Sequence, residues 1–340
     1  MIPASAHIWL EFLACLTVIG FAGVKLAFYG DVIADKTGMG GTWVGVIMLA
    51  TVTSLPELVT GVVSVSAADF PDIAVGDLLG ACVFNLVILV LLDFLHRGKT
   101  LYQESGEGHV LSAAFGILLS GFVGFNIFVS HNGTQPPALL HIGLYTPIIM
   151  IIYAAGVRTV FRYEKTHVAA FTDQAPDQCP HLSLAQSVLR YCLAALLVVG
   201  AGIWLPFIGN RIALAMQWQH SFVGTVFIAI ATTVPELAVS VAAVRIGALD
   251  MAIANLLGSN MFNMFILALD DLCYTSGPLL TRVSRAHVVS SFSVMIMTGL
   301  AIIGLFYKPR GRVLRTVGWT SIFLFSFYLL NSYMLYLFSR

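Results

Sequence analysis

The sequence predicts an all-α polytopic membrane protein in which ten transmembrane helices form two inverted five-helix repeats. The first observation behind this fold class is composition. The chain of 340 residues is 58% hydrophobic and 10% charged, with a mean hydropathy of +0.90, whereas a soluble domain carries about 25% charged residues. The other two observations are the number of long apolar runs and an internal repeat that covers most of the chain.

Ten apolar runs are long enough to cross a bilayer, which takes roughly 20 helical residues. They cover residues 7–29, 42–67, 73–95, 110–130, 138–160, 184–206, 221–245, 251–272, 287–307 and 315–338. The polar stretch 162–183 has no helical or strand periodicity, so we expect a cytoplasmic linker there. A single transmembrane domain would then consist of a first repeat, 1–161, and a second, 184–340.

The two halves carry nearly the same polar motif. Residues 45–93 include T-S-L-P-E-L and residues 224–271 include T-T-V-P-E-L, so Glu57 matches Glu236 at an offset of 179. After one extra residue near 69–72 the offset is 178, and Asn85 matches Asn263. Because each half holds an odd number of helices, the second half enters the membrane inverted. Inverted repeats are typical of transporters whose binding site lies near the bilayer midplane.

The distribution of Lys and Arg predicts the orientation in a plasma or inner membrane. With the N-terminus outside, the cytoplasmic loops hold eleven Lys and Arg residues and the outer segments hold four. Cytoplasmic loops usually carry the excess, so both termini are expected outside. The formal net charge of zero gives no reason to expect a nucleic-acid partner. The expected partner is the lipid bilayer.

A carboxylate at membrane depth indicates a functional site, because burying it is costly. Glu57 shares one helix face with Thr53 and Ser54. Pro56 has no N–H, so it leaves the carbonyl of Val52 without its helical partner. The second half repeats this arrangement with Thr232, Thr233, Pro235 and Glu236. Carboxylate, hydroxyl and carbonyl oxygens together suit a hard cation, and they fit Ca²⁺ or Na⁺ better than Mg²⁺. These ions would be substrates, and we expect no cofactor.

A second polar stripe follows on the next helix of each half. Asp77, Ala81 and Asn85 are spaced four apart. The matching positions in the second half hold Asn255, Ser259 and Asn263. Three further acids, Asp93, Asp270 and Asp271, stand at the far ends of these helices, where we expect interfacial positions.

The segments T-S-L-P-E-L…D-I-A-V-G-D-L-L-G-A-C-V-F-N and T-T-V-P-E-L…D-M-A-I-A-N-L-L-G-S-N-M-F-N resemble the two alpha-repeats of the cation/calcium exchanger superfamily, most closely its prokaryotic sodium/calcium exchanger type. The resemblance covers nearly the whole chain. It implies that Glu57 and Glu236 bind Ca²⁺ and Na⁺ in turn, flanked by Asn85 and Asn263. The further ligands it implies are Ala50, Thr53, Ser54, Ala229, Thr232, Thr233 and Ser259.

Two departures from the family pattern keep other functions open. Ala81 stands where the family usually has Ser, which removes a hydroxyl, and Thr233 replaces the usual Ser, a milder change. Asp77 replaces the common Asn one turn from Ala81 and adds a charge. The loss at Ala81 favours a Ca²⁺/H⁺ exchanger as the alternative. A non-transporting membrane cation sensor or scaffold is an alternative of another class. An enzyme is not expected, because the spans contain neither H-E-x-x-H nor G-x-S-x-G.

The orientation is testable by cysteine labelling. In a chain lacking the five native cysteines, we expect cysteines placed at Lys165 and Gly133 to react from opposite sides of the membrane. An impermeant maleimide applied to intact cells should label the Gly133 position, and the Lys165 position only after permeabilisation. Labelling of both positions in intact cells would contradict the predicted arrangement.

Overall fold

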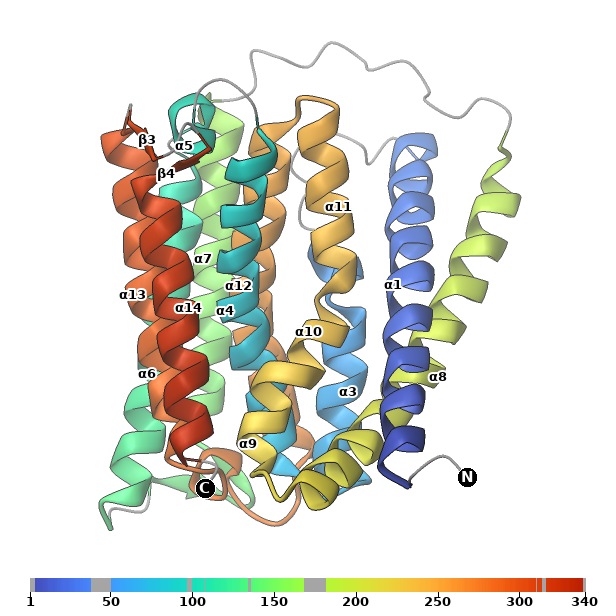
Figure 1. The fold of residues 1–340 in the computed structure, drawn as a ribbon, viewed down its shortest axis with the longest axis vertical. Helices are drawn as coiled ribbons and strands as arrows, with labels where there is room; N and C mark the ends of the chain where they lie inside the picture. The colour runs from blue at the N-terminus through green and yellow to red at the C-terminus, as the bar shows by residue number, and fades with distance from the viewer. Residues whose placement is uncertain are drawn as a thin grey trace.

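The computed structural model describes residues 4–37, 50–96, 100–106, 108–133, 136–167, 182–309, 311–313 and 316–338. These residues form a bundle of long helices (Figure 1). The long helices are α1 (Ala4–Lys36), α4 (Pro71–Leu95), α6 (His109–His131), α7 (Tyr145–His167), α8 (Leu184–Met216), α12 (Leu249–Cys273), α13 (Ala286–Tyr307) and α14 (Trp319–Phe338). The shorter ones are α3 (Leu55–Ser66), α5 (Leu101–Glu104), α9 (His220–Val223), α10 (Ala229–Thr232), α11 (Val234–Arg245) and the 3₁₀ turn η2 (Leu279–Thr281).

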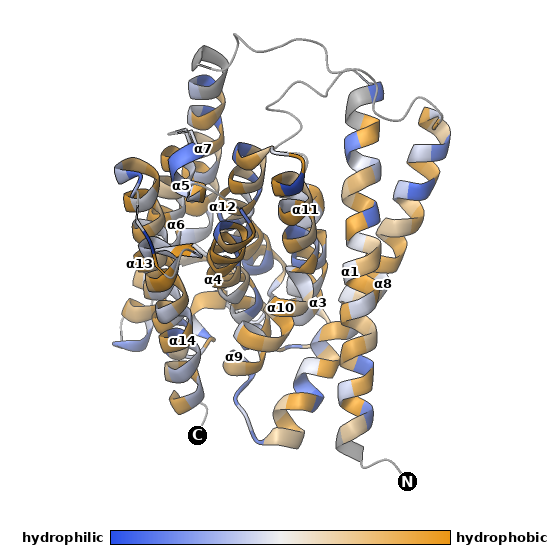
Figure 2. Ribbon diagram, turned by 45° about the horizontal axis from the view of Figure 1, so that its top comes forward, coloured by the Kyte–Doolittle hydropathy of each residue, from blue (hydrophilic) through white to orange (hydrophobic). Residues whose placement is uncertain are grey.

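The helices have the length and composition of membrane spans. Seven helices of the described part are long and apolar enough to cross a bilayer, and an eighth span results if α9–α10 and α11, bent by 45°, count as one. Apolar residues dominate the helices in Figure 2, and large side chains such as Phe21, Phe125 and Leu196 are exposed on them. Such surfaces need lipid around them. The protein is therefore an integral membrane protein.

Helices from the two halves of the chain match in length and run in opposite directions. α1 and α8 both have 33 residues, α3 and α11 both have 12, and α4 and α12 both have 25. In Figure 1, α1 rises from the N-terminus while α8 descends beside it, and α4 rises while α12 descends. α1 and α8 pack together at one side of the bundle (Figures 1 and 2).

The centre of the bundle is formed by α4 and α12. In their most apolar stretches, 67% of α4 and 78% of α12 are buried, against 22% of α14. α6 packs against α12 and α13 packs against α4, and the main apolar core lies among these helices. The helices that carry the predicted polar stripe are thus the ones most shielded from lipid.

Three predicted boundaries differ from the structure. The span expected at 138–160 begins at Tyr145, after a two-stranded hairpin of β1 (Ala138–Leu139) and β2 (Ile142–Gly143). Likewise, the span expected at 315–338 begins at Trp319, after β3 (Arg312–Val313) and β4 (Val317–Gly318). The first residues of the expected linker 162–183 continue α7 to His167. Residues 168–181 and 42–49 lie outside the described residues.

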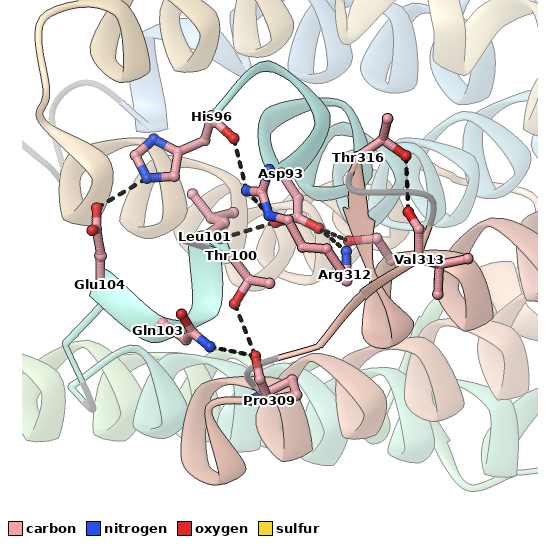
Figure 3. A network of polar contacts seen from close by, with 12 residues as sticks. Asp93, His96, Thr100, Leu101, Gln103, Glu104, Pro309, Arg312, Val313 and Thr316 are labelled. Atoms are coloured by element: carbon pink, nitrogen blue, oxygen red, sulfur yellow. Dashed lines mark hydrogen bonds and ion pairs between the residues drawn. The ribbon is translucent and has the colours of Figure 1, made fainter. Parts of the chain in front are cut away.

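In each hairpin, the backbone amide of the last strand residue donates a hydrogen bond to a buried aspartate. At the end of α4, Asp93 accepts hydrogen bonds from the amides of Leu101 (2.9 Å) and Gly318 (2.7 Å) and from the Ser321 hydroxyl (2.7 Å). Arg312 approaches the same carboxylate at 3.9 Å and donates to the carbonyl of His96 (Figure 3). Asp93 therefore ties the start of α14 to the end of α4.

Asp271 plays the same part at the end of α12. Its carboxylate accepts bonds from the amides of Leu279 (2.7 Å) and Gly143 (3.0 Å) and from the hydroxyls of Tyr145 (2.6 Å) and Thr146. Each aspartate thus joins its own half to the other half. Asp93, Asp270 and Asp271, which we expected at interfacial positions, are all fully buried within the protein. Loop and hairpin residues cover Asp93 and Asp271.

A second matched pair fixes the opposite ends of α4 and α12. Asp72 accepts from His287 (2.9 Å) and from the amide of Ser284 (2.6 Å). Asp250, its counterpart 178 residues later, bonds His109 (2.8 Å) and the amide of Gly106. α4 is thereby tied to the start of α13, and α12 to the start of α6.

We expect Asp271→Asn to destabilise the fold. Hydrogen bonds to a charged group contribute about 1.5–3 kcal/mol each, and the substituted amide would turn an NH₂ group toward donors. Thermal melting of the detergent-solubilised protein should show a lower Tm. Asp69→Asn is the matched control, because Asp69 is exposed and asparagine tolerates its positive φ of 56°. Equal Tm values for the two variants would contradict the assigned role of Asp271.

Candidate ion-binding site

The site forms where two helices are interrupted at matching positions. Residues 50–53 are helical, and the helix breaks at Ser54 before α3 begins. Thr233 makes the equivalent break between α10 and α11. Their ψ angles are 15° and 1°, and a proline stands in the first turn of the helix that follows. Since proline donates no hydrogen bond and crowds the preceding turn, it accounts for both breaks.

A π-helical segment, η1 (Gly224–Ile228), precedes the second break. Such segments are rare and occur often at functional sites. Two glycines of α4 pack directly against it. A Cβ on Gly76 would lie 3.0 Å from the amide nitrogen of Thr225, and one on Gly80 would lie 2.7 Å from the Thr225 Cα. Glycine is required here because the two backbones come this close.

The two glutamates are held by hydroxyls from the opposite half of the chain. Ser54 donates to Oε1 of Glu236 (3.0 Å), and Thr233 donates to Oε1 of Glu57 (3.4 Å). Ser259 on α12 also donates to Oε1 of Glu236 (3.4 Å). Both carboxylates are 1% exposed. These crossed bonds place the first turns of α3 and α11 face to face at the centre of the molecule.

The neighbouring threonines differ between the halves. Thr53 donates to the carbonyl of Ala50 (3.2 Å) and also lies within hydrogen-bonding reach of Glu236. Thr232 bonds the carbonyls of Ile228 and Ala229 and also donates to Oδ1 of Asp77 (2.8 Å). Asp77 is fully buried, so it adds a carboxylate next to one half of the site only.

The asparagines of α4 and α12 meet beside the glutamates. Asn85 donates to Oδ1 of Asn260 (2.9 Å), and Asn260 donates to the carbonyl of Cys82 (3.2 Å). Asn263 approaches the Cys82 sulfur at 3.8 Å. These bonds use the amide N–H groups and leave Oδ1 of Asn85 and of Asn263 without a protein donor.

Five buried oxygens of this region lack a hydrogen-bond donor: Oε2 of Glu57, Oε2 of Glu236, Oδ2 of Asp77, and Oδ1 of Asn85 and Asn263. Buried polar atoms are nearly always paired, so such a set needs an explanation. A cation would supply it, because each atom is an acceptor and three belong to carboxylates. The described residues contain no group of three or more His, Cys, Asp and Glu suited to a metal. The ligands that this region offers a cation are therefore carboxylate oxygens together with neutral amide oxygens.

The structure gathers the predicted site residues in the centre of the bundle. Each is buried, namely Ala50, Thr53, Ser54, Glu57, Asn85, Ala229, Thr232, Thr233, Glu236, Ser259 and Asn263. Their role as ion ligands remains a prediction. The sequence reasoning missed Asn260, which orients Asn85, and the π-helical segment. Asn260 was visible as the repeat counterpart of Cys82, but η1 left no sequence signal.

Helical spans, paired halves and a buried site of acceptor oxygens are typical of a membrane transporter for cations. The sodium/calcium exchanger protein family model matches residues 7–156 and 187–334. The chain belongs to this family of cation exchangers. The two matched regions correspond to the two halves that carry the glutamates.

Curated relatives agree with this assignment. The chain is 22% identical to the inner membrane protein YrbG of Escherichia coli over 89% of its own length and 90% of that protein. It is 35% identical to the sodium/calcium exchanger MaX1 of Methanosarcina acetivorans, over 31% of its length and 28% of that exchanger.

Solved structures share the fold over nearly the whole chain. A structure of the sodium-calcium exchanger NCX_Mj aligns with a TM-score of 0.59 and 19% identity, covering 97% of this chain and 98% of that one. The structure of native YfkE aligns with a TM-score of 0.63 and 15% identity, covering 99% and 93%. At such low sequence identities, the structural similarity shows only a shared fold.

Matched glycines test the packing that positions the site. Gly80→Ala should displace η1 and lower stability by about 1–3 kcal/mol, because overpacking forces backbone shifts. At the counterpart Gly258, the nearest atom to an added Cβ among the described residues is Ala50 Cβ at 3.5 Å, so Gly258→Ala should be tolerated better than Gly80→Ala. Thermal melting of both purified variants measures the difference. A loss of stability at Gly258 as large as that at Gly80 would contradict the assigned packing.

Proposed function

We propose that this protein exchanges Ca²⁺ for Na⁺ across the membrane by alternating access, with Glu57 and Glu236 as the carboxylates that both ions share. The observation that carries the proposal is the pair of fully buried, cross-bonded glutamates whose second oxygens have no protein donor. The two carboxylates balance the charge of one Ca²⁺, and the free amide oxygens of Asn85 and Asn263 add ligands.

Competition for one set of oxygens makes the exchange obligatory. The site can release Ca²⁺ only when another cation replaces it, because two bare carboxylates in this low-dielectric interior cost several kcal/mol each. Thr53, Thr232 and the carbonyls of Ala50 and Ala229 would complete the shell. Ser54, Thr233 and Ser259 already touch the glutamates and would turn toward the ion with them.

The proposal includes ten spans arranged as two inverted repeats, with both termini outside. The equal lengths and opposite directions of α1 and α8, and of α4 and α12, support it (Figure 1). So does the offset of 178 residues that relates the pairs Asp72–His287 and Asp250–His109. Eight of the ten spans are the seven apolar helices and the bent pair α9–α10 and α11. The remaining two are α7 and the helix that is broken at Ser54.

A proton is the alternative coupling ion. Position 81 is buried beside the site but holds alanine, whereas its counterpart Ser259 bonds a glutamate. One half of the site therefore has a hydroxyl fewer to coordinate Na⁺. The coupling experiment decides between the two ions.

The test is ⁴⁵Ca²⁺ uptake into proteoliposomes under an outward Na⁺ gradient, and separately under a pH gradient. We expect Na⁺ to drive uptake, and Glu57→Gln or Glu236→Gln to abolish it. One unit charge contributes about 4 kcal/mol at 4 Å in such surroundings, so each variant should lose Ca²⁺ affinity by more than about 100-fold.

Glu104→Gln is the control, because it makes the same substitution at an exposed glutamate (38% exposed side chain). It should transport Ca²⁺ as the wild type does. Uptake driven by the pH gradient alone would assign H⁺ as the coupling ion. Wild-type uptake by a folded Glu57→Gln or Glu236→Gln variant would refute the site.

A further inference from the structure

The outer half of the bundle, as oriented above, contains a buried carboxylate that the exchange site does not use. Asp270 lies on α12, fully buried, and neither of its oxygens has a hydrogen-bond partner among the described residues. It differs in this from its neighbour Asp271, whose carboxylate accepts four hydrogen bonds. An isolated buried carboxylate is strongly disfavoured, so a cation must accompany it.

The charged groups around Asp270 give no such cation. Those that interact with it electrostatically are Asp77 on α4 and Asp271, and both are acidic. The Cys273 thiol is close enough to interact electrostatically with the Asp270 carboxylate. No Lys, Arg or His forms an ion pair with Asp270 in the described part of the chain. The compensating charge must come from solution.

The Asp270 carboxylate packs against Gly61, a glycine of the exchange-site helix α3. A Cβ added to Gly61 of α3 would lie 2.9 Å from Oδ1 of Asp270. Gly61 follows Glu57 by four residues, and Asp270 follows Asn263 by seven, so each shares a helix face with a residue of the exchange site. Asp270 and Gly61 therefore lie beside the exchange site, along the contact between α3 and α12.

The counterpart positions in the other half are neutral. Gly61, Asp77 and Asp270 correspond to Ser240, Asn255 and Leu92. Asn255 donates to the Ser240 hydroxyl at 3.2 Å, and Leu92 is fully buried in the apolar core. Two acids and a glycine thus replace a neutral, apolar arrangement, and they do so on one side only. A purely structural role would not require this difference, because the counterpart packs without any charge.

We infer that Asp270 forms a second cation site, distinct from the Glu57–Glu236 site, which binds a monovalent cation, either H⁺ or Na⁺. A single carboxylate balances one positive charge, and the described residues offer no cluster of three acids that would favour a divalent ion. Asp77, between Asp270 and Thr232, adds negative potential that favours entry of the cation. The site lies between the exchange site and the face where α12 ends.

The test measures the stability of the purified protein in detergent rather than its transport. A ligand that binds the folded state raises Tm with its concentration. In a Glu57→Gln/Glu236→Gln background, we expect Tm to rise with Na⁺ at alkaline pH if the site binds Na⁺. If it binds H⁺, Tm should rise on acidification in Na⁺-free buffer and not respond to Na⁺. If the double variant does not fold, the series is run on the wild type with and without Asp270→Asn, and the part of the Tm response that this substitution removes reports on Asp270.

Asp270→Leu introduces the side chain found at the matching position of the other half, Leu92. We expect it to remove the Tm response to the bound cation and to leave a high, flat Tm, and Asp270→Asn should remove the same response. Asp69→Asn, which removes an exposed charge, should keep it. A response unchanged in both Asp270 variants would overturn the inference. The Tm measurement uses a protein that lacks both glutamates, so it does not depend on whether the wild type exchanges Ca²⁺. Likewise, a missing Tm response at Asp270 would not refute Ca²⁺ exchange at the glutamates.

Discussion

The structure depends on keeping two carboxylates at the centre of an apolar bundle. Glu57 and Glu236 are buried, and a buried charge destabilises a protein unless partners surround it. Each glutamate receives a hydroxyl from the other half of the chain, Ser54 for one and Thr233 for the other. Neither half can build its side of the site alone, because the stabilising donor lies in its counterpart. Stabilising both buried carboxylates therefore requires that the two halves pack against each other.

Further aspartates hold the frame around this centre. Asp93 and Asp271 join the ends of α4 and α12 to the helix starts of the other half, and Asp72 and Asp250 do so at the opposite ends through histidines. Charged hydrogen bonds in a low-dielectric interior are strong and directional. They fix the two central helices, whereas α1 and α8 pack at one side of the bundle (Figure 1). A rigid centre beside a separate helix pair suits alternating access.

The two halves are similar but not identical, and their differences carry chemical information. Thr232 donates to Asp77, and the position that matches Asp77 in the other half holds the neutral Asn255. Ser259 touches a glutamate, whereas its counterpart is Ala81. Asp270 is unpartnered, whereas its counterpart Leu92 belongs to the core. These substitutions make one end of the α4–α12 pair more acidic than the other, so cations approaching from the two faces meet different fields.

By itself, the sequence determined the membrane class, the repeat and the candidate ligands, because hydropathy and a duplicated Pro–Glu motif are local patterns. It missed the hairpins before α7 and α14, since Gly143 and Gly318 end them by bonding aspartates more than 120 residues away. It placed Asp93, Asp270 and Asp271 at the interface, because a helix end gives no sign of the loops that cover it. Only the tertiary structure decided which oxygens already have donors and which remain free for a cation, since that depends on contacts between the halves.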